Sequence, residues 1–279
     1  MRFPRFWARS STGRCQAWGW SDASQADAEA QARDRARHAD EHRRTDGSAI
    51  STYGYGERPF REPVLREIRG RDGGLEAVLT RNAYGAQILN AARALFVDVD
   101  LPMKLERGSG GWFRRLIRRA EYEVDKAAEL AALERAERWA AAKPGWNWRV
   151  YRTRAGLRLL ATQELFDAVE MAAGPLFREL GADPRYSCLC KAQRCFRARL
   201  TPKPWRLGLA PPPERWPFRN AAAESRFNDW QRRYEAAREA WATCRLVAVF
   251  GTGEPHRDLE EVTALHDRLS RADIELPLA

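Results

Sequence analysis

No apolar stretch in the sequence approaches the roughly 18 consecutive residues that are needed to cross a bilayer. The N-terminal segment has arginines and aromatic residues, but it lacks the continuous apolar region of a secretory signal. These absences argue against a membrane protein and an exported protein, and they predict a cytoplasmic one. With 279 residues, 44% of them hydrophobic and 31% charged, the chain is long enough and apolar enough to bury a core.

Lysine is scarce, because only five of the 48 basic residues are lysines and the other 43 (48 − 5) are arginines. One interpretation is a GC-rich genome that encodes arginine in place of lysine, and the abundant alanine agrees with it. The other is a phosphate-binding surface, because a guanidinium group can donate two parallel hydrogen bonds to phosphate. Codon usage does not explain the net charge of +10, which predicts a polyanionic partner such as nucleic acid.

Cysteine and histidine are also few, with five and four residues. An odd number of cysteines without an export signal predicts reduced thiols. Cys188, Cys190 and Cys195 lie close together, but their spacing departs from that of the usual zinc sites. Buried or incidental thiols are therefore favoured over a zinc site, which stays open as the alternative. The histidines do not cluster with these cysteines, and neither a Ser-His-Asp nor a Cys-His site has support in the local sequence.

The pattern of apolar and chain-breaking residues predicts a single α+β domain with helices packed on a mainly antiparallel sheet. Residues 1–70 are interpreted as an N-terminal extension of helix and loop, and residues 71–279 as the core. Strands are expected at residues 77–80, 91–100, 146–153, 157–162, 195–201 and 245–250. Helices are expected at residues 112–142, 164–180, 222–243 and 259–269. The Pro-rich segment 201–218 is expected to have no regular structure.

Two acidic residues, Asp98 and Asp100, end the strand that is expected to be central and buried. Alternation along a strand places both carboxylates on the same side of the sheet, roughly 6–7 Å apart. Hard oxygen ligands at this spacing suit Mg²⁺ or Mn²⁺, which complete their coordination with water and substrate phosphates. The alternative is a strand end at which the two aspartates simply face solvent.

A basic hairpin follows the expected long helix and contains Arg152, Arg154 and Arg158 around a turn at Gly156. Backbone N–H groups and guanidinium groups arranged around such a turn could hold a triphosphate. The alternative is an exposed arginine-rich hairpin in an arginine-rich protein.

A third basic stretch combines a strand with a Pro-stiffened loop. Arg197 and Arg199 are predicted to share one face of the strand, and Lys203, Trp205 and Arg206 follow on the loop. Cationic side chains interleaved with an aromatic ring are typical of surfaces that track a nucleic-acid backbone and stack its bases. This stretch is the predicted nucleic-acid contact.

The segments FVDVD and VYRTRAGLRLLAT resemble the first two motifs of the archaeo-eukaryotic primase superfamily, which includes primase-polymerases. The resemblance covers about residues 89–206. It implies that the DxD strand binds a divalent metal and that the hairpin meets the phosphates of the incoming nucleotide, with Thr153, Gly156 and Arg158 near the family's motif positions. Arg158 stands where the family usually has histidine. The family's third metal-binding aspartate has no clear equivalent, because Asp167 and Asp183 are expected on a helix and a turn.

Two functions follow from these patterns. In the first, Asp98 and Asp100 hold the metal of a nucleotidyl-transfer enzyme whose arginines clamp a triphosphate and guide a polynucleotide. In the second, the chain is a non-catalytic nucleic-acid-binding accessory protein that needs only the basic, aromatic surface. Asp98, Asp100, Arg158 and at least one of Arg197 and Arg199 are expected to line one shared cleft, and in a functional arrangement the acids would lie on its floor and the arginines around its rim. The alternative is that each acid pairs with a nearby arginine in a separate surface salt bridge.

Overall fold

The structure, a computed structural model, describes residues 1–46, 59–105 and 122–279. It combines helices with antiparallel sheets, which confirms the α+β fold class. Two four-stranded sheets form the body, with the strand orders β12-β9-β10-β6 and β11-β5-β4-β3. Two strand pairs, β1-β2 and β7-β8 (Met103–Leu105 and Tyr122–Val124), lie apart from them. None of the described helices is both long and apolar enough to cross a membrane.

The first sheet carries the predicted hairpin and the predicted acidic strand. Its strands are β6 (Phe96–Asp100), β9 (Asn147–Thr153), β10 (Gly156–Ala161) and β12 (Cys244–Gly251). All residues of β10 are buried, as expected for a strand with neighbours on both edges and helices over its faces. Gly156 opens β10, and a Cβ built there would lie 2.0 Å from the Val99 carbonyl oxygen. Glycine therefore allows the tip of the hairpin to approach the end of β6.

The second sheet consists of β3 (Val64–Arg69), β4 (Leu75–Arg81), β5 (Gln87–Ala91) and β11 (Phe196–Arg199). The single strand expected over residues 91–100 is wrong, because β5 ends at Ala91 and β6 begins at Phe96, in the other sheet. Ala94 and Leu95 in the intervening bend are buried in the core. An apolar run therefore indicated burial correctly, but burial alone does not show where an extended chain bends.

The described helices are α1 (Gln25–Asp46), α3 (Lys126–Ala141), α4 (Ala168–Ala173), α5 (Leu176–Leu180), α6 (Pro184–Gln193), α7 (Ala221–Arg238) and α8 (Glu260–Ser270). The helix expected over 112–142 is wrong at its start, since β8 precedes α3 and Asp125 caps α3 by accepting from the Ala127 N–H. Residues 106–121 of that expectation lie outside the described residues. The Pro-rich segment contains a 3₁₀ helix over Pro204–Leu207, contrary to expectation, because proline fits the first turn of a helix.

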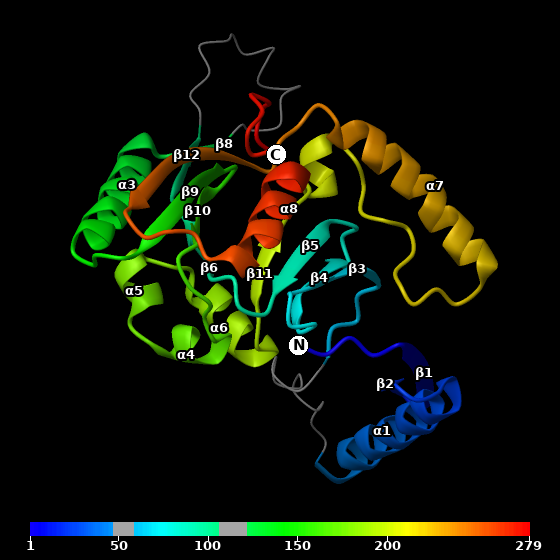
Figure 1. The fold of residues 1–279 in the computed structure, drawn as a ribbon. Helices are drawn as coiled ribbons and strands as arrows, with labels where there is room; N and C mark the ends of the chain where they lie inside the picture. The colour runs from blue at the N-terminus through cyan, green and yellow to red at the C-terminus, as the bar shows by residue number, and fades with distance from the viewer. Residues whose placement is uncertain (47–58, 106–121) are drawn as a thin grey trace, which may run out of the picture.

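An N-terminal unit of β1 (Phe6–Thr12), β2 (Cys15–Ser21) and α1 lies at one end of the molecule, coloured blue in Figure 1. The strand β1 was not expected from the sequence. Ala28 and Ala32 of α1 pack against Ala8, and a Cβ at Gly19 would lie 2.0 Å from the Ala28 carbonyl oxygen. Small residues thus let the helix lie directly on the hairpin.

The two large sheets meet where their edge strands β6 and β11 adjoin, next to α6 (Figure 1). In the described part of the chain no backbone ladder joins these two strands. Instead, the Tyr186 hydroxyl donates to the Phe96 carbonyl oxygen at 3.1 Å and accepts from the Arg197 N–H at 3.2 Å. The Asp183 N–H donates to the Asp98 carbonyl oxygen at 3.0 Å. We call this junction the seam, and it positions the candidate site.

Candidate functional site

Asp98 and Arg158 lie opposite each other in the β6–β10 pair and form the centre of the site. Arg158 Nε donates to Asp98 Oδ1 at 2.9 Å, and Arg158 Nη1 donates to the Arg199 carbonyl oxygen across the seam at 3.0 Å. Arg158 is only 2% exposed. Burial opposes its charge, but Asp98 more than compensates and keeps the pKa of Arg158 above its usual range. Arg158 thus pairs with Asp98 within its own sheet and joins that sheet to β11 through the Arg199 carbonyl oxygen.

The relative depth of Arg158 and the two acids is the reverse of the predicted one. The arginines were predicted to stand around a rim above the two acids. In the structure Arg158 is buried, the Asp98 side chain is 33% exposed, and Asp100 is exposed at the end of β6. The reason is that Arg158 occupies a central strand, whereas the acids belong to an edge strand that ends there.

Asp100 lies among charges of both signs. Desolvation raises its pKa, and so does repulsion from Asp183 and Asp98, while Lys203 and Arg199 lower it by less. From the sequence, Asp183 was expected on a turn. It is the N-cap of α6 and accepts from the Arg185 N–H at 3.1 Å, and its own N–H is held by β6. A proline directly after an aspartate was the available signal for this cap.

Three cations interact with Asp100, namely Arg199, Lys203 and Arg206, and Arg154 lies close to Arg206; we call these four residues the cation cluster. Burial lowers the pKa of Arg199 to about 10, and repulsion from Arg206 and Arg158 contributes. Burial, with repulsion from Arg199 and Arg206, lowers the pKa of Lys203 to about 8. Burial and repulsion from Arg154 lower the pKa of Arg206. The cluster therefore holds positive charges close together at a cost in free energy.

Two nitrogen atoms of the cation cluster are buried without a hydrogen-bond partner among the described residues: Arg199 Nε and Arg206 Nη1. Buried guanidinium nitrogens normally have acceptors, and leaving one unpaired is costly. Asp98 accepts from Arg158 and forms no hydrogen bond with either of these nitrogens. The site thus has donors and positive charge in excess of its own acceptors.

Two exposed aromatic rings border the cation cluster. Lys203 Nζ lies 5.5 Å from the centroid of the Trp205 ring, and Tyr84 meets Trp205 edge-on at 5.4 Å between centroids. Trp205 is 38% exposed and Tyr84 is 45% exposed. Tyr84 belongs to the β4–β5 turn, 121 positions before Trp205 in the sequence, and no local pattern linked the two.

Two predicted site residues point elsewhere. Arg152 alternates with Tyr151 along β9, so it faces away from Arg158 and instead pairs with Glu129 of α3, Nε to Oε1 at 3.0 Å. Arg197 donates to both carboxylate oxygens of Glu62 at 2.8 and 3.0 Å, and its guanidinium lies over the Phe60 ring. Each of these arginines already has a carboxylate, so neither joins the cation cluster.

The residues at the end of β6 do not fit a metal ion as they are placed. Asp98 is held by Arg158, Asp183 caps α6, and cationic groups face Asp100. Across the described residues no group of three or more His, Cys, Asp or Glu side chains is arranged to hold a metal. Binding of Mg²⁺ or Mn²⁺ by Asp98 and Asp100 therefore stays a prediction.

The cysteines form no disulfide, and Cys188 is exposed whereas Cys190 and Cys195 are buried. Burial raises the pKa of Cys190 to about 12 and that of Cys195 to about 11, so both are neutral thiols.

Sequence reasoning missed a contact behind Arg158, where His266 Nε2 lies 4.0 Å from Cys244 Sγ and His266 Nδ1 lies 2.9 Å from Asp267 Oδ1. Cys244 and His266 are both fully buried, and 22 positions separate them in the sequence. They resemble a nucleophile and base in geometry, but a substrate would have no access to them.

Comparisons of this chain with protein-family models, with curated proteins and with solved structures find no match. The primase-like interpretation therefore stays a prediction that rests on the short motifs alone.

Proposed function

We propose that this protein binds the phosphates of a nucleic acid or nucleotide at the cation cluster, without catalysing a reaction there. The observation that carries the proposal is the crowding of Arg199, Lys203 and Arg206, whose charges repel one another and whose pKa values are lowered. A bound phosphate supplies the missing negative charge and the missing acceptors. Guanidinium groups with free donor positions are the groups best suited to phosphate oxygens.

The neighbouring aromatic pair favours a nucleotide over a simple anion. Trp205 and Tyr84 expose ring surface next to Lys203, and a base can stack on such a ring while its phosphate contacts the lysine. The net charge of +10 adds a longer-range attraction for the same class of ligand.

The test is the salt dependence of binding to a fluorescently labelled single-stranded oligonucleotide, measured by anisotropy. The double variant Lys203→Gln/Arg206→Gln should bind more weakly, and the slope of log K against log salt should fall by about 0.7 for each lost phosphate contact. Lys126→Gln/Lys143→Gln removes the same charge from exposed positions at the two ends of α3 and serves as the matched control. Equal losses in both double variants, or an affinity that ignores salt, would contradict the proposal.

Substitution of the acids separates binding from catalysis. Asp100→Asn removes a negative charge from the cation cluster, so phosphate binding should tighten severalfold. A nucleotidyl-transfer enzyme that uses Asp100 to hold a metal would instead lose nucleotide binding in the presence of Mn²⁺. Asp273→Asn, at an exposed position near the C-terminus, controls for the change in net charge.

A further inference from the structure

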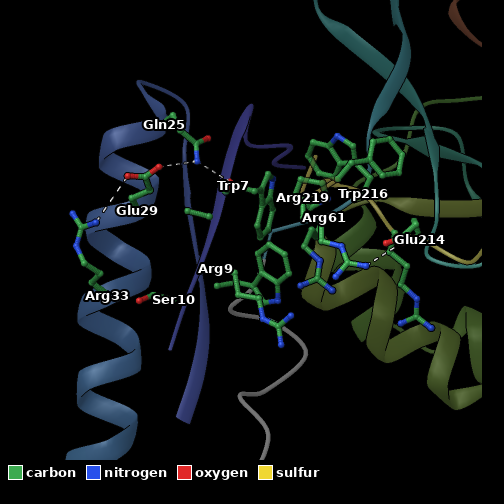
Figure 2. Close-up of a pocket in the computed structure, with 15 residues that line it drawn as sticks. Trp7, Arg9, Ser10, Gln25, Glu29, Arg33, Arg61, Glu214, Trp216 and Arg219 are labelled. Carbon is green, nitrogen blue, oxygen red and sulfur yellow. Dashed lines mark hydrogen bonds and ion pairs between the residues drawn. The ribbon is translucent and has the colours of Figure 1, made fainter. Parts of the chain in front are cut away.

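A cavity of about 890 Å³ lies between the N-terminal unit and the loop 214–219, away from the residues singled out in the sequence. Figure 2 shows Trp7 and Arg9 on one side of it and Arg61, Trp216 and Arg219 on the other. Trp18 and Phe218 complete the aromatic part of the lining, and Arg33 and Arg215 add further positive charge. We call this cavity the tryptophan pocket.

In the tryptophan pocket, arginine side chains and tryptophan rings lie next to one another. The Arg61 guanidinium lies 4.2 Å from the Trp18 ring centroid, and Trp7 meets Trp216 edge-on at 6.3 Å. Its two carboxylates are largely engaged, because Glu214 pairs with Arg219 at 3.2 Å and with Arg226, and Glu29 lies 3.9 Å from Arg33. Within the described residues Arg9 and Arg215 form no ion pair, so the pocket retains positive charge at its mouth.

A second, much smaller cavity adjoins the tryptophan pocket. Its lining includes Arg215 and Trp216, which also line the tryptophan pocket, and Asn82 and Ala83 of the β4–β5 turn. The Asn82 side chain accepts from the Tyr84 N–H in the same turn, and Tyr84 contacts Trp205. Tyr84 and Trp205 therefore connect the turn that lines this cavity with Lys203 of the cation cluster.

We propose that the tryptophan pocket is a second binding site, for bases and phosphates of a single-stranded polynucleotide whose other end lies on the cation cluster. This inference rests on the proposed function and specifies its ligand as a single strand several nucleotides long. Stacking rings beside cations select unpaired bases, because the bases of a duplex already stack on each other. Contacts spread over one strand are typical of site sizes of about 4–16 nucleotides.

The experiment compares labelled oligothymidylates of about 4 and about 16 nucleotides, the ends of that range. Arg9→Gln/Arg215→Gln should weaken binding of the long oligonucleotide roughly tenfold and leave the short one unchanged, since one strand end is enough to occupy the cation cluster. Arg14→Gln/Arg233→Gln removes two exposed arginines that do not line the pocket, and it should have little effect. Trp216→Leu should reproduce the length-dependent loss through stacking alone.

The outcomes separate the two proposals. If the short oligonucleotide binds and depends on Lys203 and Arg206, but Arg9→Gln/Arg215→Gln leaves the long one unaffected, the tryptophan pocket is not part of the site and only this inference fails. If neither oligonucleotide binds, the proposed function fails as well. Equal loss for both lengths, effective competition by a mononucleotide, or equal competition by polyglutamate would also overturn the single-strand assignment.

Discussion

Arg158 links three partners from its place in β10: the Asp98 carboxylate, the Arg199 carbonyl oxygen and, at 3.5 Å, His266 Nε2. The guanidinium is buried, so its charge depends on Asp98 for compensation. A buried cation that loses its only close carboxylate destabilises the fold, because water cannot replace the lost interaction. Asp98 therefore stabilises the fold by compensating the charge of Arg158.

Asp98→Asn should therefore lower the free energy of unfolding by about 2–3 kcal/mol, somewhat less than for a fully buried pair because one third of the Asp98 side chain is exposed. Urea denaturation measures the change, with Asp273→Asn as the control. Combining Asp98→Leu with Arg158→Met should restore part of the loss, because an apolar pair leaves no charge unpaired. A loss below about 0.5 kcal/mol, the size expected for a surface pair, would show that the pair is not buried in solution.

Phosphate affinity and the contribution of Lys203 to folding stability should depend on pH in opposite directions. Its pKa of about 8 in the folded chain lies below the ordinary lysine value of 10.5, so the unfolded chain binds more protons between these values. The contribution of Lys203 to stability therefore rises with pH across that window. Phosphate affinity should fall over the same window, because the ammonium charge is lost. Lys203→Arg keeps its charge and should remove most of the decline in affinity; an unchanged decline would assign it to another group.

Arg199→Met should stabilise the protein and weaken phosphate binding at the same time. The substitution removes a cation that is repelled by Arg206 and Arg158 and whose Nε has no hydrogen-bond partner in the described part of the chain. We expect a gain of about 1 kcal/mol in thermal or urea unfolding, together with a clear loss of oligonucleotide affinity. Destabilisation by this variant would mean that Arg199 is already satisfied within the fold.

The cysteines should differ sharply in their reaction with iodoacetamide. Cys188 is exposed and should be alkylated first under native conditions. Burial opposes ionisation of the Cys244 thiol, but His266 and Arg158 outweigh it and lower its pKa. Cys244 should nevertheless stay unmodified until the chain unfolds, because it is fully buried. Peptide mass spectrometry over time measures the order, and early modification of Cys244 would reveal an opening that reaches His266.

The sequence predicted the chemistry of single segments better than their assembly. Alternation along the chain correctly paired Asp98 with Asp100 on one face and gave the hairpin that carries Arg158. The same rule places Arg152 on the face of the sheet away from Arg158, yet the three hairpin arginines were grouped because they are close in the sequence. The partners Glu129 and Glu62, which remove Arg152 and Arg197 from the site, depend on tertiary packing that no local pattern contains.

The N-terminal segment was underestimated for a similar reason. The motifs of residues 89–206 drew attention to the core, and residues 1–70 were interpreted as an extension. The tryptophan pocket needs Trp7 and Trp18 from that extension and Trp216 from the opposite end of the chain. Their convergence becomes visible only in three dimensions.

The seam between β6 and β11 has a mechanical consequence. Side-chain hydrogen bonds through Tyr186 and Arg158 connect the two sheets there, in place of a backbone ladder. Arg154 lies in the turn between β9 and β10 of one sheet, and Arg199 ends the edge strand β11 of the other. A phosphate bound to both would therefore be an additional crosslink between the two sheets, present only while the site is occupied.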